Sequence, residues 1–428
     1  MKKFFKAAFA AILALTLALS ALPSLQAAEA AVEPAWTVPQ GYNENDYNKL
    51  AAFLELADAN GVKNGKKLSA SYDPSNPGTW GTCYDPDYYA DLPTVQWFEL
   101  DNEYRAIRIL MFDKQLVGSL DVSGLSELYY MNCSVNALDS ITITGCDKLM
   151  TFDCYSNRLT ALDVSGNSTL QFLRCDANSL TELDLSANSR LVQLTCSHNQ
   201  IAELDVSHNT SLEILNCAGN LLSGIDVSML SVLRTLDVSD NAFADDLDVS
   251  HNSALESLKC SRIGIDGIDV SAIPLLNGIY CVGNPITEFD FSVNEVLMIN
   301  SLTAEEGGFV GCELNGWYSK VYAQPHNGYA FEGWFNAAGE LISARPEYEA
   351  SELDGTVFIA RFISTGTALP GDADGNGSLN IADAVLALRY AMGLIGEDAI
   401  DLFNADINSD GSVNISDAIE ILRATMGL

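Results

Sequence analysis

The sequence predicts a multidomain α+β protein whose largest part is a β-solenoid, followed by a small β module and a small all-α calcium-binding module. Two patterns carry this prediction. A 21-residue repeat runs from about Leu120 to about Asn294, and two near-identical acidic loops, each leading into an apolar segment, lie beyond residue 370. A chain of 428 residues with several shifts of composition is expected to form more than one domain.

Cysteine and asparagine at fixed positions define the repeat. One unit, residues 170–186, reads LQFLRCDANSLTELDLS, and asparagine follows each ladder position except Cys260 by three residues. One unit has too few apolar side chains to close a core, so units must stack, with equivalent residues forming ladders about 4.8 Å apart. We expect the asparagines to satisfy backbone groups of adjacent coils. The repeated cysteines are Cys133, Cys154, Cys175, Cys196, Cys217, Cys260 and Cys281, and Val238 fills the missing place.

This spacing resembles that of bacterial leucine-rich repeat proteins, with cysteine in the last leucine position of the strand. The resemblance implies a curved, right-handed solenoid over residues 118–295. Its concave sheet is the candidate binding surface, and the positions before each cysteine, from Asn132 and Asp153 to Tyr280, are expected to point outward. These positions are mixed and polar, without a run of aromatics or a basic stripe. The ligand therefore stays open between another protein and a plant polysaccharide.

Residues 1–30 read as a signal peptide. Lys2, Lys3 and Lys6 precede an apolar run over residues 7–22, and Ala28-Glu29-Ala30 fits a cleavage site with small flanking residues. A membrane anchor is the alternative, but the run is short for a bilayer span and ends in Pro23. No later stretch is long and apolar enough to cross a membrane, so we expect an exported, extracellular protein.

Charge and cysteine content narrow the possible partners. The chain carries 22 Lys and Arg against 57 Asp and Glu, a formal net charge of −35, which disfavours nucleic acid and anionic lipid surfaces and favours cations such as calcium. Ten cysteines in an exported protein usually indicate disulfides. Parallel Cβ vectors at strand spacing fit a disulfide poorly, so the ladder cysteines are expected to be buried thiols. Cys83, Cys146 and Cys312 lie off the ladder, and the sequence does not pair them.

Residues 31–117 are not repetitive and are placed to shield the first coil from water. A helix is expected over residues 42–60, capped by Asn45 or Asp46 and ended by Gly61. The block resembles the N-terminal caps of leucine-rich repeat proteins. Its aromatic residues could form a sugar-stacking platform or pack the cap, and packing is favoured because caps bury large side chains. These residues are Trp80, Tyr84, Tyr88, Tyr89 and Trp97.

Residues 296–363 lack the repeat and read as short alternating strands separated by glycine turns. The segment GYAFEGW, residues 328–334, is followed by a closing strand over residues 356–362. This pattern resembles the divergent internalin-type B-repeat module of bacterial surface proteins, which implies a spacer or capping role. Phe331 and Trp334 are expected to fill the core of the module.

After a linker at residues 364–370, two loops share one template, with oxygen-bearing side chains at positions 1, 3, 5, 9 and 12 and glycine at position 6. Calcium prefers several oxygen ligands, and the glycine allows the sharp turn that aims them inward. We expect two calcium ions, with Ser378 and Ser412 offering backbone carbonyls, and apolar helices over residues 384–392 and 418–426. The predicted ligands are Asp372, Asp374, Asn376, Ser378, Asn380 and Asp383 in the first loop, and Asp406, Asn408, Asp410, Ser412, Asn414 and Asp417 in the second.

The two halves end alike, with ADAVLALRYAMGL at residues 382–394 and SDAIEILRATMGL at residues 416–428. Residues 371–428 resemble a type I dockerin, the module that attaches proteins to cohesin domains of a cellulosome scaffold. Well-studied dockerins carry hydroxyl pairs at loop positions 10 and 11, whereas this chain has Ile-Ala and Ile-Ser, so the matching cohesin is not identified. The resemblance implies cohesin contacts at Ile381, Ala382, Leu388, Arg389, Ile415, Ser416, Leu422 and Arg423.

Together these patterns predict a secreted, non-catalytic cellulosome component, monomeric before cohesin binding, in which the dockerin anchors and the solenoid recognises. The sequence shows no paired catalytic carboxylates within a supporting motif, no nucleophile elbow and no HExxH motif. Two alternatives stay open: a cell-surface adhesin that recognises host or neighbouring cells, and a polysaccharide-degrading enzyme with a catalytic site hidden in residues 31–117.

Overall fold

The computed structural model describes residues 36–426, except 86–89, 295–296, 298, 316–317, 327, 350–356, 365–369, 375–377, 397–398 and 409–411. The predicted signal peptide and most of the predicted linker lie outside these residues. Within the described part of the chain, no helix combines the length and the apolar character that a bilayer span needs.

The N-terminal cap contains α2 (Glu44–Glu55), α3 (Asn64–Leu68), a 3₁₀ turn (Pro77–Thr79) and the antiparallel pair β1 (Thr82–Asp85) and β2 (Ala90–Pro93). The expected helix over residues 42–60 was too long, and its predicted cap was wrong. Asn43 is the N-cap, and its side chain accepts the Asp46 N–H at 3.2 Å. Asp46 is buried inside the helix and pairs with Arg105 at 2.9 Å. The chain becomes extended at Leu56, well before Gly61.

The aromatic residues of the cap pack against one another. The Trp80 ring lies 5.0 Å from Tyr47 and 6.1 Å from Trp97, and its indole N–H donates to the Asp73 carbonyl at 3.1 Å. Trp80 is only 1% exposed. Packing of the cap is therefore confirmed for Trp80, while Trp97 is half-buried. Tyr88, Tyr89 and the side chain of Tyr84 lie outside the described residues.

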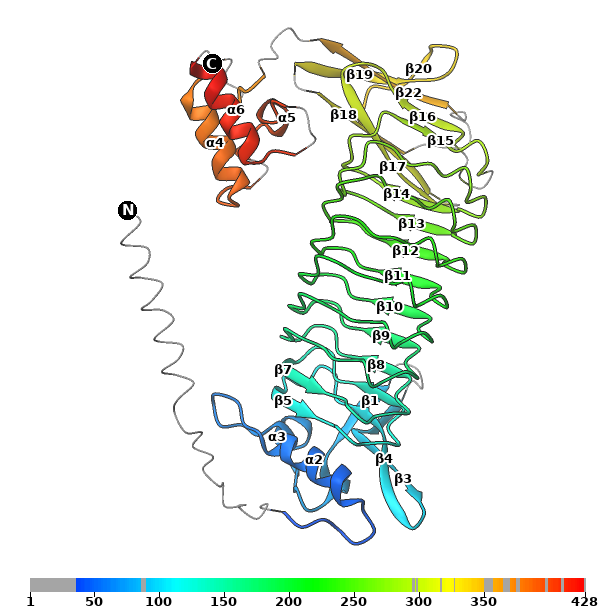
Figure 1. Cartoon of the computed structure of the whole chain (residues 1–428), viewed down its shortest axis with the longest axis vertical. Helices are drawn as coiled ribbons and strands as arrows, with labels where there is room; N and C mark the ends of the chain where they lie inside the picture. The colour runs from blue at the N-terminus through cyan, green and yellow to red at the C-terminus, as the bar shows by residue number, and fades with distance from the viewer. Residues whose placement is uncertain are drawn as a thin grey trace, which may run out of the picture. The chain divides into compact units, whose positions relative to one another are not determined.

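The repeats form a solenoid with one parallel strand per coil, as predicted (Figure 1). In the three-residue parallel strands of this sheet the middle residue is buried, and its two neighbours lie on the outer face. The strands are β4 (Glu103–Leu110), β6 (Tyr130–Asn132), β8 (Thr151–Asp153), β9 (Phe172–Arg174), β10 (Gln193–Thr195), β11 (Ile214–Asn216), β12 (Thr235–Asp237), β13 (Ser257–Lys259) and β14 (Gly278–Cys281). An antiparallel strand, β3 (Val95–Leu100), pairs with β4, while β5 (Val117–Asp121) and β7 (Ala137–Thr142) form a separate parallel pair.

The asparagine ladder works as expected. Asn199 donates from its amide nitrogen to the carbonyls of Cys175 at 3.1 Å and Cys196 at 3.0 Å, and its amide oxygen accepts the Leu180 N–H at 3.0 Å. A second asparagine ladder, which the sequence analysis did not assign a role, ties the opposite turns of successive coils. In that ladder Asn188 donates to the carbonyls of Val164 and Asn167, both at 3.0 Å.

All ten cysteines are free and buried. Cys312 extends the ladder, although it lies outside the repeat, because β17 (Gly308–Asn315) pairs antiparallel with β14 and brings Cys312 opposite Cys281. Cys146 lies elsewhere in the solenoid, with its Sγ 3.1 Å from the Val122 carbonyl oxygen, and Cys83 belongs to β1 in the cap. Burial raises the pKa of Cys217 and of Cys146 from 9.0 to about 12, so both thiols stay protonated at neutral pH.

The β module shares the solenoid sheet. Strands β17, β18 (Tyr318–Pro325) and β21 (Glu347–Glu349) continue that sheet beyond β14, giving thirteen strands in all. A second sheet has the order β15-β16-β22-β19-β20, formed by Glu288–Asp290, Ser301–Ala304, Val357–Ser364, Tyr329–Phe335 and Leu341–Ser343 respectively. Trp334 is fully buried and lies 5.7 Å from the half-buried Phe331, which confirms both as packing residues.

Among the described residues, the C-terminal part contains the helices α4 (Ile381–Ala391), α5 (Leu402–Ala405) and α6 (Ile415–Met426). The predicted helices began three residues too late, since Ile381 and Ile415 are already helical. A small apolar core joins the three helices, with Ala387 from α4, Ala405 from α5 and Ile421 from α6 fully buried.

Candidate functional site

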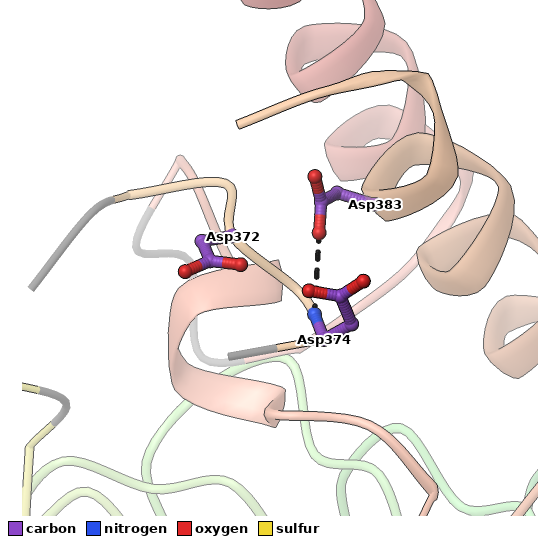
Figure 2. Close-up of side chains that lie close together, drawn as sticks. All are labelled: Asp372, Asp374 and Asp383. Carbon is purple, nitrogen blue, oxygen red and sulfur yellow. Dashed lines mark hydrogen bonds between the residues drawn. The ribbon is translucent and has the colours of Figure 1, made fainter. Parts of the chain in front are cut away.

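Three carboxylates meet at the start of α4. One oxygen each of Asp372, Asp374 and Asp383 lies within 4.8 Å of the others (Figure 2). Asp372 and Asp383 are buried, whereas Asp374 is exposed. The structure therefore gathers the predicted ligands of loop positions 1, 3 and 12 around one point.

Asp383 holds the loop and the helix together. Its Oδ2 accepts the Asn380 N–H at 2.8 Å. Its Oδ1 accepts the Asp374 N–H at 3.2 Å, the hydrogen bond that Figure 2 shows. Asn380 in turn accepts the Ala382 N–H at 2.8 Å, which completes a capping box. The capping box explains why the helix begins at Ile381. The same contacts fix the position-12 carboxylate toward the loop.

The second loop repeats this arrangement. Asp417 is buried and accepts the Asn414 N–H at 2.9 Å, while Asn414 accepts the Ser416 N–H at 2.7 Å. The Asn408 N–H points to Asp417 at 3.5 Å, and Asp406 ends α5. Asn376 and Asp410, the predicted ligands at position 5, lie outside the described residues. The structure thus brings three predicted carboxylates of the first loop together and shows the duplicated loop-to-helix junction of the second.

The predicted backbone ligands lie beside the capping residues. The Ser378 carbonyl accepts the Asn380 side-chain N–H at 2.8 Å, and the Ser412 carbonyl accepts that of Asn414 at 3.2 Å. Carboxylate, amide and carbonyl oxygens form the donor set that calcium prefers. Three carboxylates within 4.8 Å of one another repel unless a cation lies among them. The donor set therefore fits calcium.

All eight predicted cohesin contacts lie on the exposed surface of α4 and α6 or at their first turns. The structure adds four exposed apolar residues that the sequence analysis missed: Val385, Met392, Ile419 and Met426. With Ile381 and Leu388, or Ile415 and Leu422, they form one stripe on each helix at spacings of four, three and four residues. This helical spacing, repeated in both halves, is the sequence signal that could have found them.

Residues 370–424 match the family described as the dockerin type I domain. This chain carries a type I dockerin domain. The matched residues include the loops of both halves and most of α6. The dockerin match covers a small part of the 428 residues, and most of the other described residues belong to the solenoid with its cap and β module.

Among solved structures, internalin and leucine-rich repeat proteins are similar to the chain. The functional domain of InlJ from Listeria monocytogenes, which its title says includes a cysteine ladder, gives a TM-score of 0.45 at 22% identity, covering 62% of this chain and 68% of that chain. An internalin, InlF, from the same organism gives 0.32 at 17% identity, covering 40% and 60%. YopM from Yersinia enterocolitica gives 0.33 at 25% identity, covering 37% and 34%. No curated protein matches the chain.

Two positions on the outer face of the solenoid are buried by their neighbours. Asn132 and Asp153 belong to the line that was expected to point outward, and both are buried. Arg174 covers Asp153 with two hydrogen bonds, of 2.7 Å from Nε and 2.6 Å from Nη2, and Asn132 accepts the Ser134 hydroxyl at 2.5 Å. Both side chains are therefore taken up by contacts within the sheet. His208 and His251 are exposed in turns.

Proposed function

We propose that this protein is a secreted, non-catalytic component of a cellulosome. Its dockerin attaches it to a scaffold cohesin in a calcium-dependent way, and its solenoid presents the recognition surface. The observation that carries the proposal is the meeting of Asp372, Asp374 and Asp383 at the start of α4, within a segment that matches the dockerin type I domain.

Each loop is proposed to hold one calcium ion. In the first loop, Asp372, Asp374, Asn376, Asn380 and Asp383 supply side-chain oxygens, and Ser378 supplies its carbonyl. Asp406, Asn408, Asp410, Asn414, Asp417 and the carbonyl of Ser412 do so in the second loop. Bound calcium offsets the repulsion between the carboxylates, so the loop geometry and the helices that begin there become stable together.

The exposed stripes on α4 and α6 are proposed to be the cohesin-binding surface. Contiguous exposed apolar side chains on a soluble protein mark a surface that a binding partner covers. Leu388 with Arg389 and Leu422 with Arg423 combine an apolar anchor with a cation, a composition typical of interface centres. Because the two halves are near copies, either helix can be presented to the cohesin.

Residues 1–30 are proposed to direct export, after which the chain is extracellular and cellulosome-associated. The resemblance of the solenoid to leucine-rich repeat proteins supports a role in ligand recognition and points to no catalytic group. Its ligand is a protein or a plant polysaccharide. The adhesin alternative would use the same surface with a ligand on another cell.

The test is titration of the full chain against recombinant type I cohesins, followed by calorimetry, with calcium and with a chelator. We expect binding to at least one cohesin in calcium and none after chelation. A D383N/D417N variant should fail to bind in calcium because each loop loses a carboxylate ligand. Binding that is equal with and without calcium contradicts the proposal. Steady release of reducing sugar from cellulose, xylan or pectin by the repurified chain contradicts its non-catalytic part.

A further inference from the structure

One line of residues on the outer face of the thirteen-stranded sheet carries no charge. Register pairing places these ten residues side by side on successive strands, from β6 in the solenoid to β18 in the β module. We call this line the neutral track. It consists of Tyr130, Thr151, Phe172, Gln193, Ile214, Thr235, Ser257, Gly278, Asn315 and Tyr318. In a chain of net charge −35, ten adjacent positions without an acidic or basic side chain set this line apart.

The polar side chains of the track differ from their neighbours in hydrogen bonding. One line further along the strands, Arg174 binds Asp153, and Lys259 lies 3.6 Å from Asp237. Thr195 and Ser197 both donate to Asp176, at 2.5 Å and 2.7 Å. In the track, the side chains of Thr151, Gln193, Thr235 and Ser257 are half-buried, and within the described part of the chain they make no hydrogen bond to another protein group. Their donors and acceptors are available to a ligand.

The track also offers rings. Phe172 and Tyr318 are the exposed aromatics of the track, each more than one third accessible. Most of the polar residues of the track, Gln193, Thr235, Ser257 and Asn315, lie between them. Tyr130 is less available for stacking because the Arg108 guanidinium lies 4.2 Å from its ring centroid. Hydroxyl and amide groups flanked by apolar rings suit a ligand that has both hydroxyls and apolar faces.

The spacing of the track favours a carbohydrate over a peptide. Neighbouring strands are about 4.8 Å apart, so the ten positions extend over about 43 Å. A β-linked pyranose unit in an extended glycan is close in length to one strand spacing, so successive sugars can meet successive strands. An extended peptide advances about 3.3 Å per residue and falls out of step with the strands. A polyanionic glycan would be repelled by this strongly acidic protein, because the track holds no cation to offset the repulsion.

We propose that the neutral track binds an uncharged, extended polysaccharide chain, with Phe172 and Tyr318 stacking on sugar faces and Gln193 and Thr235 hydrogen-bonding to hydroxyls. This inference rests on the proposed role of the solenoid as the recognition surface and names its ligand class. It also gives the β module a binding role in addition to its structural one, because Asn315 and Tyr318 belong to β17 and β18.

The test uses the full chain and three probes: cellohexaose and xylohexaose as neutral glycans, and polygalacturonate as an anionic one. We expect calorimetry to detect binding of a neutral hexasaccharide and no binding of polygalacturonate. The Q193L/T235V variant removes hydrogen-bonding groups with small changes of shape and should bind at least about tenfold more weakly. The matched control is T181V/Q200L, which makes the same two kinds of change at exposed positions outside the track, and it should bind like the wild type.

Three results would overturn the inference: no binding of either neutral glycan, preference for polygalacturonate, or equal loss of binding in both double variants. Absence of glycan binding would favour a protein ligand for the solenoid. Calcium-dependent cohesin binding, measured on the same samples, tests the proposed function separately because the dockerin does not include the track. It also reports whether the dockerin of each variant is intact, while an unchanged unfolding midpoint reports an intact solenoid.

Discussion

The solenoid and the dockerin both bury polar side chains, but they differ in the partners that these side chains need. In the solenoid, Asn199 gives its amide hydrogens to carbonyls of two coils and accepts a backbone N–H from a third position. In the dockerin, Asp372 and Asp383 are buried beside Asp374, and Asp383 accepts two backbone N–H groups. The amide of Asn199 is satisfied within the fold, whereas the grouped carboxylates favour a bound cation.

This difference follows from charge and size. A ladder of amides repeats over many coils, and each added coil buries more apolar surface. The dockerin has a small core of mostly alanine side chains, so the repulsion of three carboxylates is large relative to its apolar stabilisation. We infer that the solenoid is stable without metal and that the dockerin is stable with calcium. The chain then combines a solenoid surface that stays folded without metal with a dockerin whose stability depends on calcium.

The largest expected effect is on cohesin binding through the duplicated helix face. An L388A/R389A variant should bind cohesin only modestly more weakly, because α6 offers the same residues. An L422A/R423A variant should behave in the same way. Changing all four residues should abolish binding, since no intact anchor is left. Calorimetry of the four proteins in calcium measures this, and complete loss from either double variant alone contradicts the symmetric account.

A large effect on stability is expected from the asparagine ladder. In N199L, the Leu180 N–H loses its acceptor inside the core, and the carbonyls of Cys175 and Cys196 each lose one of two asparagine donors, so the free energy of unfolding should fall by about 3 kcal/mol. The exposed neighbour provides the control, because Q200L changes no buried hydrogen bond. Urea denaturation followed by circular dichroism compares them. Removing calcium should not change the difference in unfolding free energy between N199L and Q200L. A difference that depends on calcium argues against a solenoid that is stable without metal.

A smaller effect is expected from the buried thiols. The pKa of Cys217 is raised from 9.0 to about 12 in the folded chain, so the folded state holds this proton more tightly than the unfolded state does. Its contribution to stability is therefore complete below pH 9.0 and is lost as the pH rises toward about 12. The denaturation midpoint should fall less steeply with rising pH in C217V than in the wild type. Valine is chosen because Val238 occupies the same position in the next coil. An identical slope in both proteins contradicts the assignment.

Much of the fold could be predicted because repetition makes one physical requirement visible many times. Each coil must bury the same residues, so the register of Cys175 and Asn178 predicts the stacking. The two acidic loops could be located for a similar reason, because oxygen-bearing side chains recur at fixed positions in both copies. Asp372, Asp374 and Asp383 lie where that template places them.

The unpredicted features depend on contacts between distant segments. Cys312 joins the ladder only because β17 turns back along β14, and no local pattern encodes that pairing. Asp46 appears in sequence as a helix cap, yet the distant Arg105 draws it into a buried ion pair and leaves the cap to Asn43. Asp153 is buried because Arg174, one coil further on, covers it. Eight residues of the neutral track follow the repeat and could be predicted from the sequence, whereas Asn315 and Tyr318 join it only because β17 and β18 continue the solenoid sheet.

Hydrogen exchange of the full chain, with and without calcium, tests the difference between the two regions most directly. Peptides from α4 and α6 should be protected in calcium and should lose that protection after chelation, while peptides from β9 to β12 should keep theirs. The D383N/D417N variant should show the unprotected helix pattern even in calcium. Helices that stay protected without calcium, or solenoid strands that lose protection together with them, would contradict the account.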